Sequence, residues 1–274
     1  MSEILSRPDN LPDYQNPPLN EVVLGVQFAP AQGYQQIRAG EVWKLYQSDF
    51  PLVEEQLPIP PNFETFGLPF QGNALNFGFV TGAMHDRFWF LSPSKDELIQ
   101  FQPDRLLHNW RKVKGHNNSY PRFEKIIASF EKELFCLEQY FRSLSPQDIK
   151  CNQAEISYIN YIPLDHDGPR SQFSNWLRFL NFGNPEPDDA SVTLRRTLIR
   201  SDGAPYGRII CELNTALNPQ GARMLVLTLT VRGAPLDQSI SAALQFLKGG
   251  RDVIVEEFTS ITTDSAHELW GRVR

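Results

Sequence analysis

Residues 21–28 read EVVLGVQF, and every second side chain from Val22 onward is a large apolar one. This alternation predicts a β-strand with one buried face. Residues 122–142 instead repeat apolar side chains every three or four positions, which predicts a long amphipathic helix. Together the two stretches predict a sheet that is covered by helices on one side.

The first half of the chain holds further elements around this strand and this helix. Residues 34–50 have helical spacing and end at a proline, whereas residues 51–69 contain five prolines, which predicts an irregular connection. Pro121 is predicted to lie in the first turn of the helix at 122–142. Between these segments, strand-like runs separated by turn residues occur at residues 75–81, 87–91 and 97–102.

The second half repeats the same order of elements. It contains a predicted strand at 153–162, a short helix at 171–182, strands at 191–200, 208–217 and 223–232, and a long amphipathic helix at 236–261. Gly249 and Gly250 lie inside the long helix and predict a kink or a break there, since each glycine costs about 1 kcal/mol relative to alanine. Ser265 and Glu268 have capping-box spacing, which predicts a last short helix.

Both halves therefore read β-α-β-β-β-α. The sequence predicts an α+β protein in which two β-α-β-β-β-α units form one antiparallel, curved sheet with long helices packed on one face. Residues 1–20 form a polar, Pro-rich, extended arm, residues 21–145 the first unit and residues 146–274 the second. Joining the units edge to edge gives one continuous, pseudo-duplicated domain and removes two exposed sheet edges.

Composition excludes several classes of protein. The chain is 41% hydrophobic, which argues against global disorder, and no apolar run approaches the roughly 20 residues that span a bilayer. The N-terminus lacks the apolar core of a signal peptide. Three scattered cysteines without a CxxC motif are typical of a reduced cytoplasm, so we expect a cytoplasmic protein. The net charge of -6 makes nucleic-acid binding unlikely as the main activity.

The motifs that would carry catalysis are absent from the sequence. It contains no HExxH, no GxSxG, no Walker A and no GxGxxG pattern. Asp165, His166 and Asp167 form the densest metal-like cluster, but adjacent residues of an extended chain point to opposite sides, which favours a solvated loop. We therefore expect no cofactor, no metal and no catalytic residue, and we favour a non-enzymatic protein.

Arginines are the one polar cluster that predicts a binding surface. Arg195, Arg200 and Arg208 lie on two predicted neighbouring strands and could bind an anion or a partner. Alternation places Arg195 on the opposite face from Arg196, which falls with the apolar side chains of its strand. The structural alternative is a solvated sheet face without a binding role.

Two stretches resemble a known family. Residues 16–28, NPPLNEVVLGVQF, are similar to the opening signature of an uncharacterised, sporadically distributed family of bacterial proteins of about this length. Residues 251–263, RDVIVEEFTSITT, followed by Trp270, are similar to that family's C-terminal helix and tail. The resemblance implies no activity, cofactor or catalytic residue. The patchy distribution implies a phage-defence or toxin–antitoxin context.

These observations predict a non-enzymatic cytoplasmic binding protein. It would hold a protein or peptide partner on the uncovered sheet face, or through the Pro-rich arm. The alternative is an enzyme or small-ligand carrier with a pocket between sheet and helices. A homodimer stays open, and nucleic-acid binding through the arginines would require strongly salt-dependent affinity.

Overall fold

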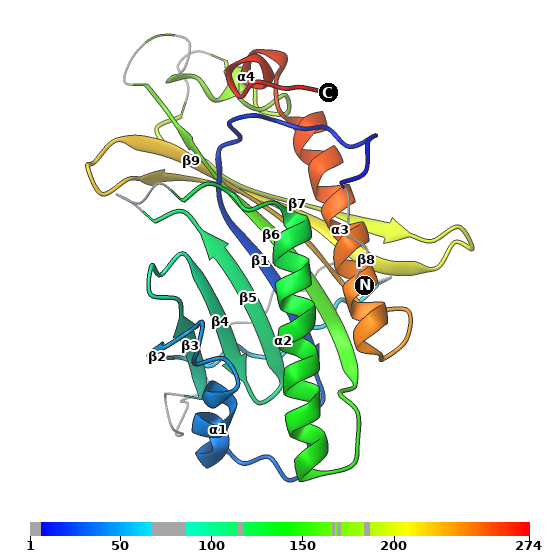
Figure 1. Cartoon of the computed structure of the whole chain (residues 1–274). Helices are drawn as coiled ribbons and strands as arrows, with labels where there is room; N and C mark the ends of the chain where they lie inside the picture. Colours follow the sequence, from blue (N-terminus) through cyan, green and yellow to red (C-terminus); the bar gives the residue numbers. More distant parts are fainter. Residues whose placement is uncertain (1–6, 67–85, 114–117, 166–167, 169–170, 184–186) are drawn as a thin grey trace.

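The computed structural model describes residues 7–66, 86–113, 118–165, 168, 171–183 and 187–274. The predicted strand at 75–81 lies outside these residues. The described strands form one antiparallel sheet of nine strands in the order β2-β3-β4-β5-β1-β6-β9-β8-β7 (Figure 1). The strands are β1 Leu19–Phe28, β2 Leu52–Gln56, β3 Arg87–Leu91, β4 Glu97–Gln102, β5 Arg105–Arg111, β6 Cys151–Pro163, β7 Ser191–Ile199, β8 Pro205–Leu217 and β9 Arg223–Gly233.

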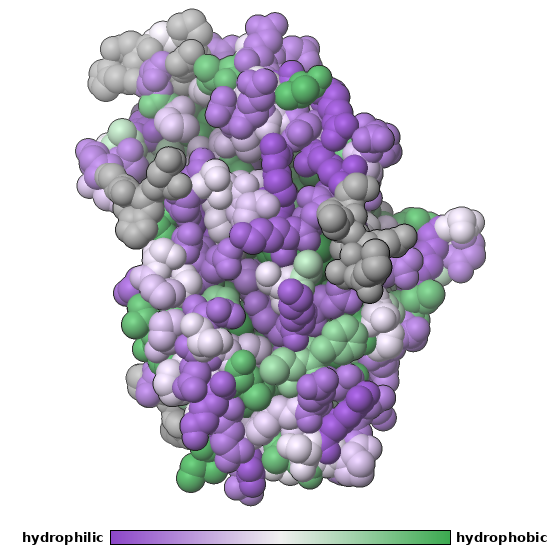
Figure 2. Space-filling view, viewed as in Figure 1, coloured by the Kyte–Doolittle hydropathy of each residue, from purple (hydrophilic) through white to green (hydrophobic). Residues whose placement is uncertain are grey.

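The long helices lie side by side on one face of this sheet (Figure 1). The helices are α1 Ala39–Lys44, α2 Phe123–Leu144, α3 Ile240–Ile261 and α4 Asp264–Leu269, with 3-10 turns η1 Gln36–Arg38 and η3 Phe173–Asn175. Seen from the helix side, the surface is mainly hydrophilic with scattered apolar spots (Figure 2). The apolar stripes of α2 and α3 are therefore turned inward, where they pack on residues such as Leu24 and Ile156. None of the described helices is long and apolar enough to span a membrane.

The predicted break at Gly249 and Gly250 is wrong, because α3 runs through both residues as one helix. A Cβ atom on Gly250 would lie 2.7 Å from Cγ2 of Ile156 and 3.2 Å from Cγ1 of Val231. The missing side chain lets the helix axis approach β6 and β9 closely, and this packing outweighs the poor helix propensity of glycine. Gly250 also identifies Ile156 and Val231 as residues of the helix-covered face.

Two strands of the first half were not predicted. β5, RLLHNWR, pairs with β1, and its polar residues hid it from a search for apolar alternation. His108 and Asn109 of this strand are buried, because Glu133 and Glu21 supply their partners. β2 lies in the segment predicted to be irregular. Among the described strands it is at the edge of the sheet, where a strand needs backbone partners on one side only.

Some predicted helices are shorter in the structure. The helix predicted at 171–182 is reduced to η3, and the one at 34–50 to η1 and α1. Helix α2 begins at Phe123, after the predicted Pro121, and its N-cap Arg122 has a φ of 75°. Helix α4 is present, but Thr263, not Ser265, caps it by accepting a hydrogen bond from the Ala266 N–H. The strands predicted in the second half are confirmed as β6, β7, β8 and β9, with small shifts of their ends.

The N-terminal arm, residues 7–18, is tied to the C-terminal tail. Tyr14 and Arg272 form an antiparallel bridge. The Gln15 and Asn16 N–H groups donate to the carbonyls of Gly271 and Trp270 at 3.0 Å. The two ends of the chain therefore hold each other against the end of α3.

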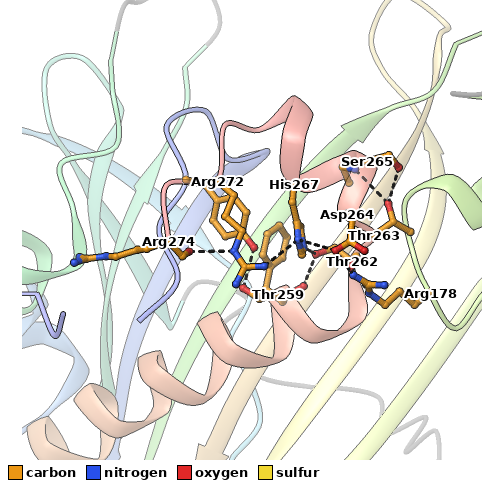
Figure 3. A network of polar contacts seen from close by, with 12 residues as sticks. Arg178, Thr259, Thr262, Thr263, Asp264, Ser265, His267, Arg272 and Arg274 are labelled. Carbon is orange, nitrogen blue, oxygen red and sulfur yellow. Dashed lines mark hydrogen bonds and ion pairs between the residues drawn. The ribbon is translucent and has the colours of Figure 1, made fainter. Parts of the chain in front are cut away.

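A buried histidine links α3, α4 and the tail (Figure 3). The Thr262 hydroxyl donates to the Phe258 carbonyl at 2.6 Å, so it accepts from Nε2 of His267 at 2.7 Å. Nδ1 of His267 is left to accept from Arg272 at 3.3 Å. Burial and the positive charge of Arg272 lower the pKa of His267 from 6.5, so the ring is neutral at pH 7.

This network predicts that acid weakens the protein at the C-terminal end. Because the folded-state pKa of His267 lies below 6.5, the unfolded chain binds the proton more readily, and stability falls as pH drops below about 6.5. We expect wild type to lose stability relative to His267→Gln between pH 7 and pH 5 in urea unfolding. Arg272→Gln should reduce that loss, and identical pH profiles for wild type and His267→Gln would contradict the assignment.

Candidate functional site

The face of the sheet that carries no long helix presents a row of aligned side chains. In antiparallel strands, directly paired residues point to the same side of the sheet. Gly25 pairs with Glu155, Glu155 with Arg232, and Arg232 with Arg208. These residues alternate with Leu24 and its paired neighbours on the helix side. The row therefore faces away from α2 and α3.

Other residues of this face are polar but buried, which means that the face is covered in part. Gln27, Gln102, Arg105 and Gln153 are between 6% and 7% exposed. The cover is an extended segment, residues 57–66, which we call the strap. It follows β2 and crosses the strands from β3 to β8 on the side opposite the helices, where it runs behind the sheet in Figure 1.

The sheet holds the main chain of the strap through side-chain hydrogen bonds. Gln102 accepts from the Ile59 N–H at 2.8 Å and donates to the Ile59 carbonyl at 2.9 Å. Gln27 accepts from the Asn62 N–H at 3.2 Å. At the two ends, the Leu57 carbonyl accepts from Arg87 at 2.8 Å, and the Thr65 carbonyl accepts from Arg208 at 3.0 Å. These contacts recognise the main chain of an extended segment and do not depend on a particular sequence of side chains.

Glu64 is the only charged side chain of residues 57–66, and the sheet binds it through ion pairs. Its carboxylate lies 2.8 Å from Nε of Arg208 and 2.7 Å from Nη2 of Arg232, and the Glu64 side chain is 7% exposed. Arg232 also contacts Glu155 at 2.9 Å. Burial lowers the pKa of Arg232, but the two carboxylates outweigh burial and raise it above its usual value. The guanidinium therefore stays charged.

A small hollow, partly open to solvent, lies beneath the strap. Gly25 supplies no side chain there, and Gln27, Asn62, Arg105 and Gln153 surround the gap. Oε1 of Gln153 is buried and has no hydrogen-bond partner among the residues that the structure describes. The side-chain oxygen of Gln153 is thus a hydrogen-bond acceptor on this sheet face that the strap does not use.

The structure places the three predicted site residues in different surroundings. Arg208 is in the ion cluster with Glu64. Arg195 lies two residues along β7 from Thr197, whose partner is Arg208, so Arg195 shares that face. Arg200 lies beyond the end of β7 in a turn, 5.4 Å from the ring centroid of Tyr206. Arg196 points to the helix side, where it pairs with Glu257, as the alternation predicted.

Sequence reasoning missed Glu64 and Arg232. Glu64 lies in the Pro-rich segment, where no periodicity signals its position. Arg232 is the last charged residue of β9, and alternation alone could have placed it beside Arg208 once the pairing of β8 and β9 was known. The polar alternation of Gln100 and Gln102 in β4 was a further signal that this face is polar.

No three or more His, Cys, Asp or Glu side chains within the described ranges are grouped so that they could hold a metal ion; His166 and Asp167 are outside those ranges. Comparison of the chain with known protein families, with curated proteins and with solved structures finds no match. The candidate site therefore rests on its own geometry, which is that of a sheet face that holds an extended segment with one buried carboxylate.

Proposed function

We propose that the protein is a non-enzymatic binding protein that holds an extended, acidic segment of a partner protein on the sheet face opposite the helices. The observation that carries this proposal is the strap itself, which is held as a bound peptide would be held. Gln102 makes a two-point contact with the strap backbone, and Arg208 and Arg232 together bind one carboxylate. Backbone contacts provide affinity and the paired arginines provide selectivity.

In this proposal the strap is the internal occupant of the face and the partner displaces it. A tethered segment competes with an effective concentration in the millimolar range, so a free peptide binds weakly until the strap is loosened. Charge complementarity favours an acidic partner, because Arg208 and Arg232 together bind the carboxylate of the strap. A partner side chain that reaches Oε1 of Gln153 with a donor would also use this acceptor, which has no partner among the described residues.

We further propose that residues 21–145 and 146–274 are related units built on a β-α-β-β-β-α plan, to which the first half adds one more described strand. The strand order supports this, because β1 and β6 are neighbours at the centre of the sheet and later strands of each half lie outward from them. Such a duplication gives one long face, which suits an extended partner. A phage-defence or toxin–antitoxin setting in the cytoplasm would supply a protein partner of this kind.

A labelled peptide with the strap sequence, LPIPPNFETF, tests the recognition chemistry. We expect the peptide to bind the Glu64→Gln variant at least about tenfold more tightly than wild type in fluorescence anisotropy, because the internal competitor is weakened. Replacing the peptide's own glutamate by glutamine should cost at least about tenfold in affinity for that variant.

A matched pair of neighbouring arginines supplies the control. In the Glu64→Gln background, Arg195→Ala should weaken binding several-fold because Arg195 shares the binding face, whereas Arg196→Ala should leave affinity unchanged because Arg196 pairs with Glu257 on the helix side. The proposal fails if the Glu64→Gln variant does not bind the peptide, or if acidic and amide peptides bind alike.

A further inference from the structure

A second cavity lies on the helix side of the sheet, beneath the N-terminal arm. The cavity is partly open to solvent. Leu229 of β9 and Ile254 and Phe258 of α3 supply apolar walls, and residues of the arm, among them Pro12 and Pro17, line it from the other side. The cavity is thus separated from the strap by the whole thickness of the sheet.

Two arginines at this cavity share one carboxylate. Oδ1 of Asp13 lies 3.6 Å from Arg7 and 2.9 Å from Arg122. Nε of Arg7 is buried and has no hydrogen-bond partner among the described residues. The nearby Glu124 is already paired with Arg251 at 2.9 Å. Arg7 and Arg122 thus share the carboxylate of Asp13, and the Nε of Arg7 is left without an acceptor among the described residues.

A tyrosine pair adds a hydroxyl donor. The hydroxyl groups of Tyr120 and Tyr158 lie 3.0 Å apart, so one donates to the other and the second proton is left for another acceptor. Burial raises the pKa of Tyr158 to about 12 and raises that of Tyr120 as well, so both hydroxyls keep their protons at neutral pH. Both residues line the cavity.

The backbone at the rim is strained. Arg122 has a φ of 75°, a conformation that is unfavourable for a residue other than glycine. This conformation carries the chain into α2, whose first turn has no side-chain cap, so its N–H groups add positive potential near the cavity. Strain of this kind persists where surrounding contacts hold it, and here it places Arg122 at the rim.

We propose that this cavity binds a small amphipathic carboxylate. Its apolar body would pack on Leu229, Ile254 and Phe258, and its carboxylate would be held by Arg7, Arg122 and the free hydroxyl proton of the tyrosine pair. A carboxylate would join Asp13 between the two guanidinium groups and accept from the Nε of Arg7. The apolar walls favour an apolar body, such as an aromatic ring system.

Calorimetric titration of the full chain with 2-naphthoate tests the proposal. We expect one site, with affinity at least about tenfold higher than for 2-naphthylmethanol, which has the same apolar body without the charge. This comparison uses wild type and does not depend on the folding of any variant. Equal affinity for the two compounds, or no binding of 2-naphthoate at millimolar concentration, would overturn the proposal.

Variants locate the binding within the chain. Arg122→Gln should weaken 2-naphthoate binding at least about tenfold, and Val255→Trp should abolish it by filling the cavity. Because Arg122 also holds Asp13, Tyr158→Phe provides a milder second variant, with an expected loss of several-fold. Arg178→Gln, which breaks a pair with Asp264 outside the cavity, is the matched control and should bind as wild type does. Unchanged binding by Arg122→Gln would place the ligand elsewhere and refute the site.

Discussion

Replacing Glu133 by alanine is expected to lower the free energy of unfolding by about 3–5 kcal/mol, because the change leaves a buried histidine without its partner. Both oxygens of the Glu133 carboxylate lie 3.0 Å from Nδ1 of His108, which is 1% exposed. Nε2 of His108 has no hydrogen-bond partner among the described residues. Denaturant unfolding of wild type and Glu133→Ala measures the loss directly.

Glu131→Ala is the matched control, since Glu131 lies in the same turn of α2 but is only partly buried and has no ion pair among the described residues. It should change stability by no more than about 0.5 kcal/mol. Equal losses for the two variants would show that the helix position, and not the contact with His108, determines the effect.

The pair of His108 and Glu133 gives the stability of the protein a pH dependence opposite in sign to the one expected from His267. Burial lowers the pKa of His108, but the charge and hydrogen bond of Glu133 outweigh burial and raise it above 6.5. The resulting stabilisation is complete below pH 6.5 and is lost as pH rises through the folded-state pKa. In the Glu133→Gln variant, burial is the dominant effect on the pKa of His108 and lowers it. We therefore expect the stability of this variant to fall, not rise, as the pH is lowered.

Glu64→Gln is expected to speed cleavage of the strap by chymotrypsin at least about tenfold. The substitution removes the negative charge that Arg208 and Arg232 share. Each charge-assisted hydrogen bond contributes about 1.5–3 kcal/mol to holding the strap closed. A loss of about 1.4 kcal/mol is enough to make the open population ten times larger. Cleavage after Phe63 or Phe66 reports that population when opening is fast. Mass spectrometry of the early fragments identifies the cut.

Glu54→Gln is the corresponding control, because Glu54 in β2 forms only an exposed pair with Lys95 at 3.5 Å. Exposed pairs contribute about 0–1 kcal/mol, so strap cleavage should change little. If Glu64→Gln and wild type are cut at the same rate, the ion cluster does not hold the strap, and the peptide-like description of the site loses its basis.

The second half of the sheet was predictable because its strands are long and alternate cleanly. β9, RMLVLTLTVRG, buries Leu225, Leu227, Leu229 and Val231 on one face. The stripe of α2 was equally clear, because Phe123, Ile126, Phe130 and Leu134 recur at helical spacing and are all buried. A long segment repeats its apolar period often enough to distinguish a helix from a strand, and the long segments of this chain form the core.

The candidate site was not predictable, because it depends on contacts between segments far apart in sequence. Glu64 meets Arg208 and Arg232 only when the strap has crossed the sheet. β5 was missed for a related reason: His108 is polar in sequence but is paired with Glu133 after folding. Periodicity detects apolar burial and does not detect polar groups whose partners lie elsewhere in the chain.

The outermost described strands, β2 and β7, have backbone groups that no other described strand pairs, and their sequences oppose growth of the sheet into fibres. Arg195 is the middle residue of β7, so two copies aligned antiparallel along this edge would bring arginine against arginine. At the other side, β2 is five residues long and is bounded by Pro51 and Pro58. Charge at one end and chain stiffness at the other thus disfavour the addition of further strands to these described edges.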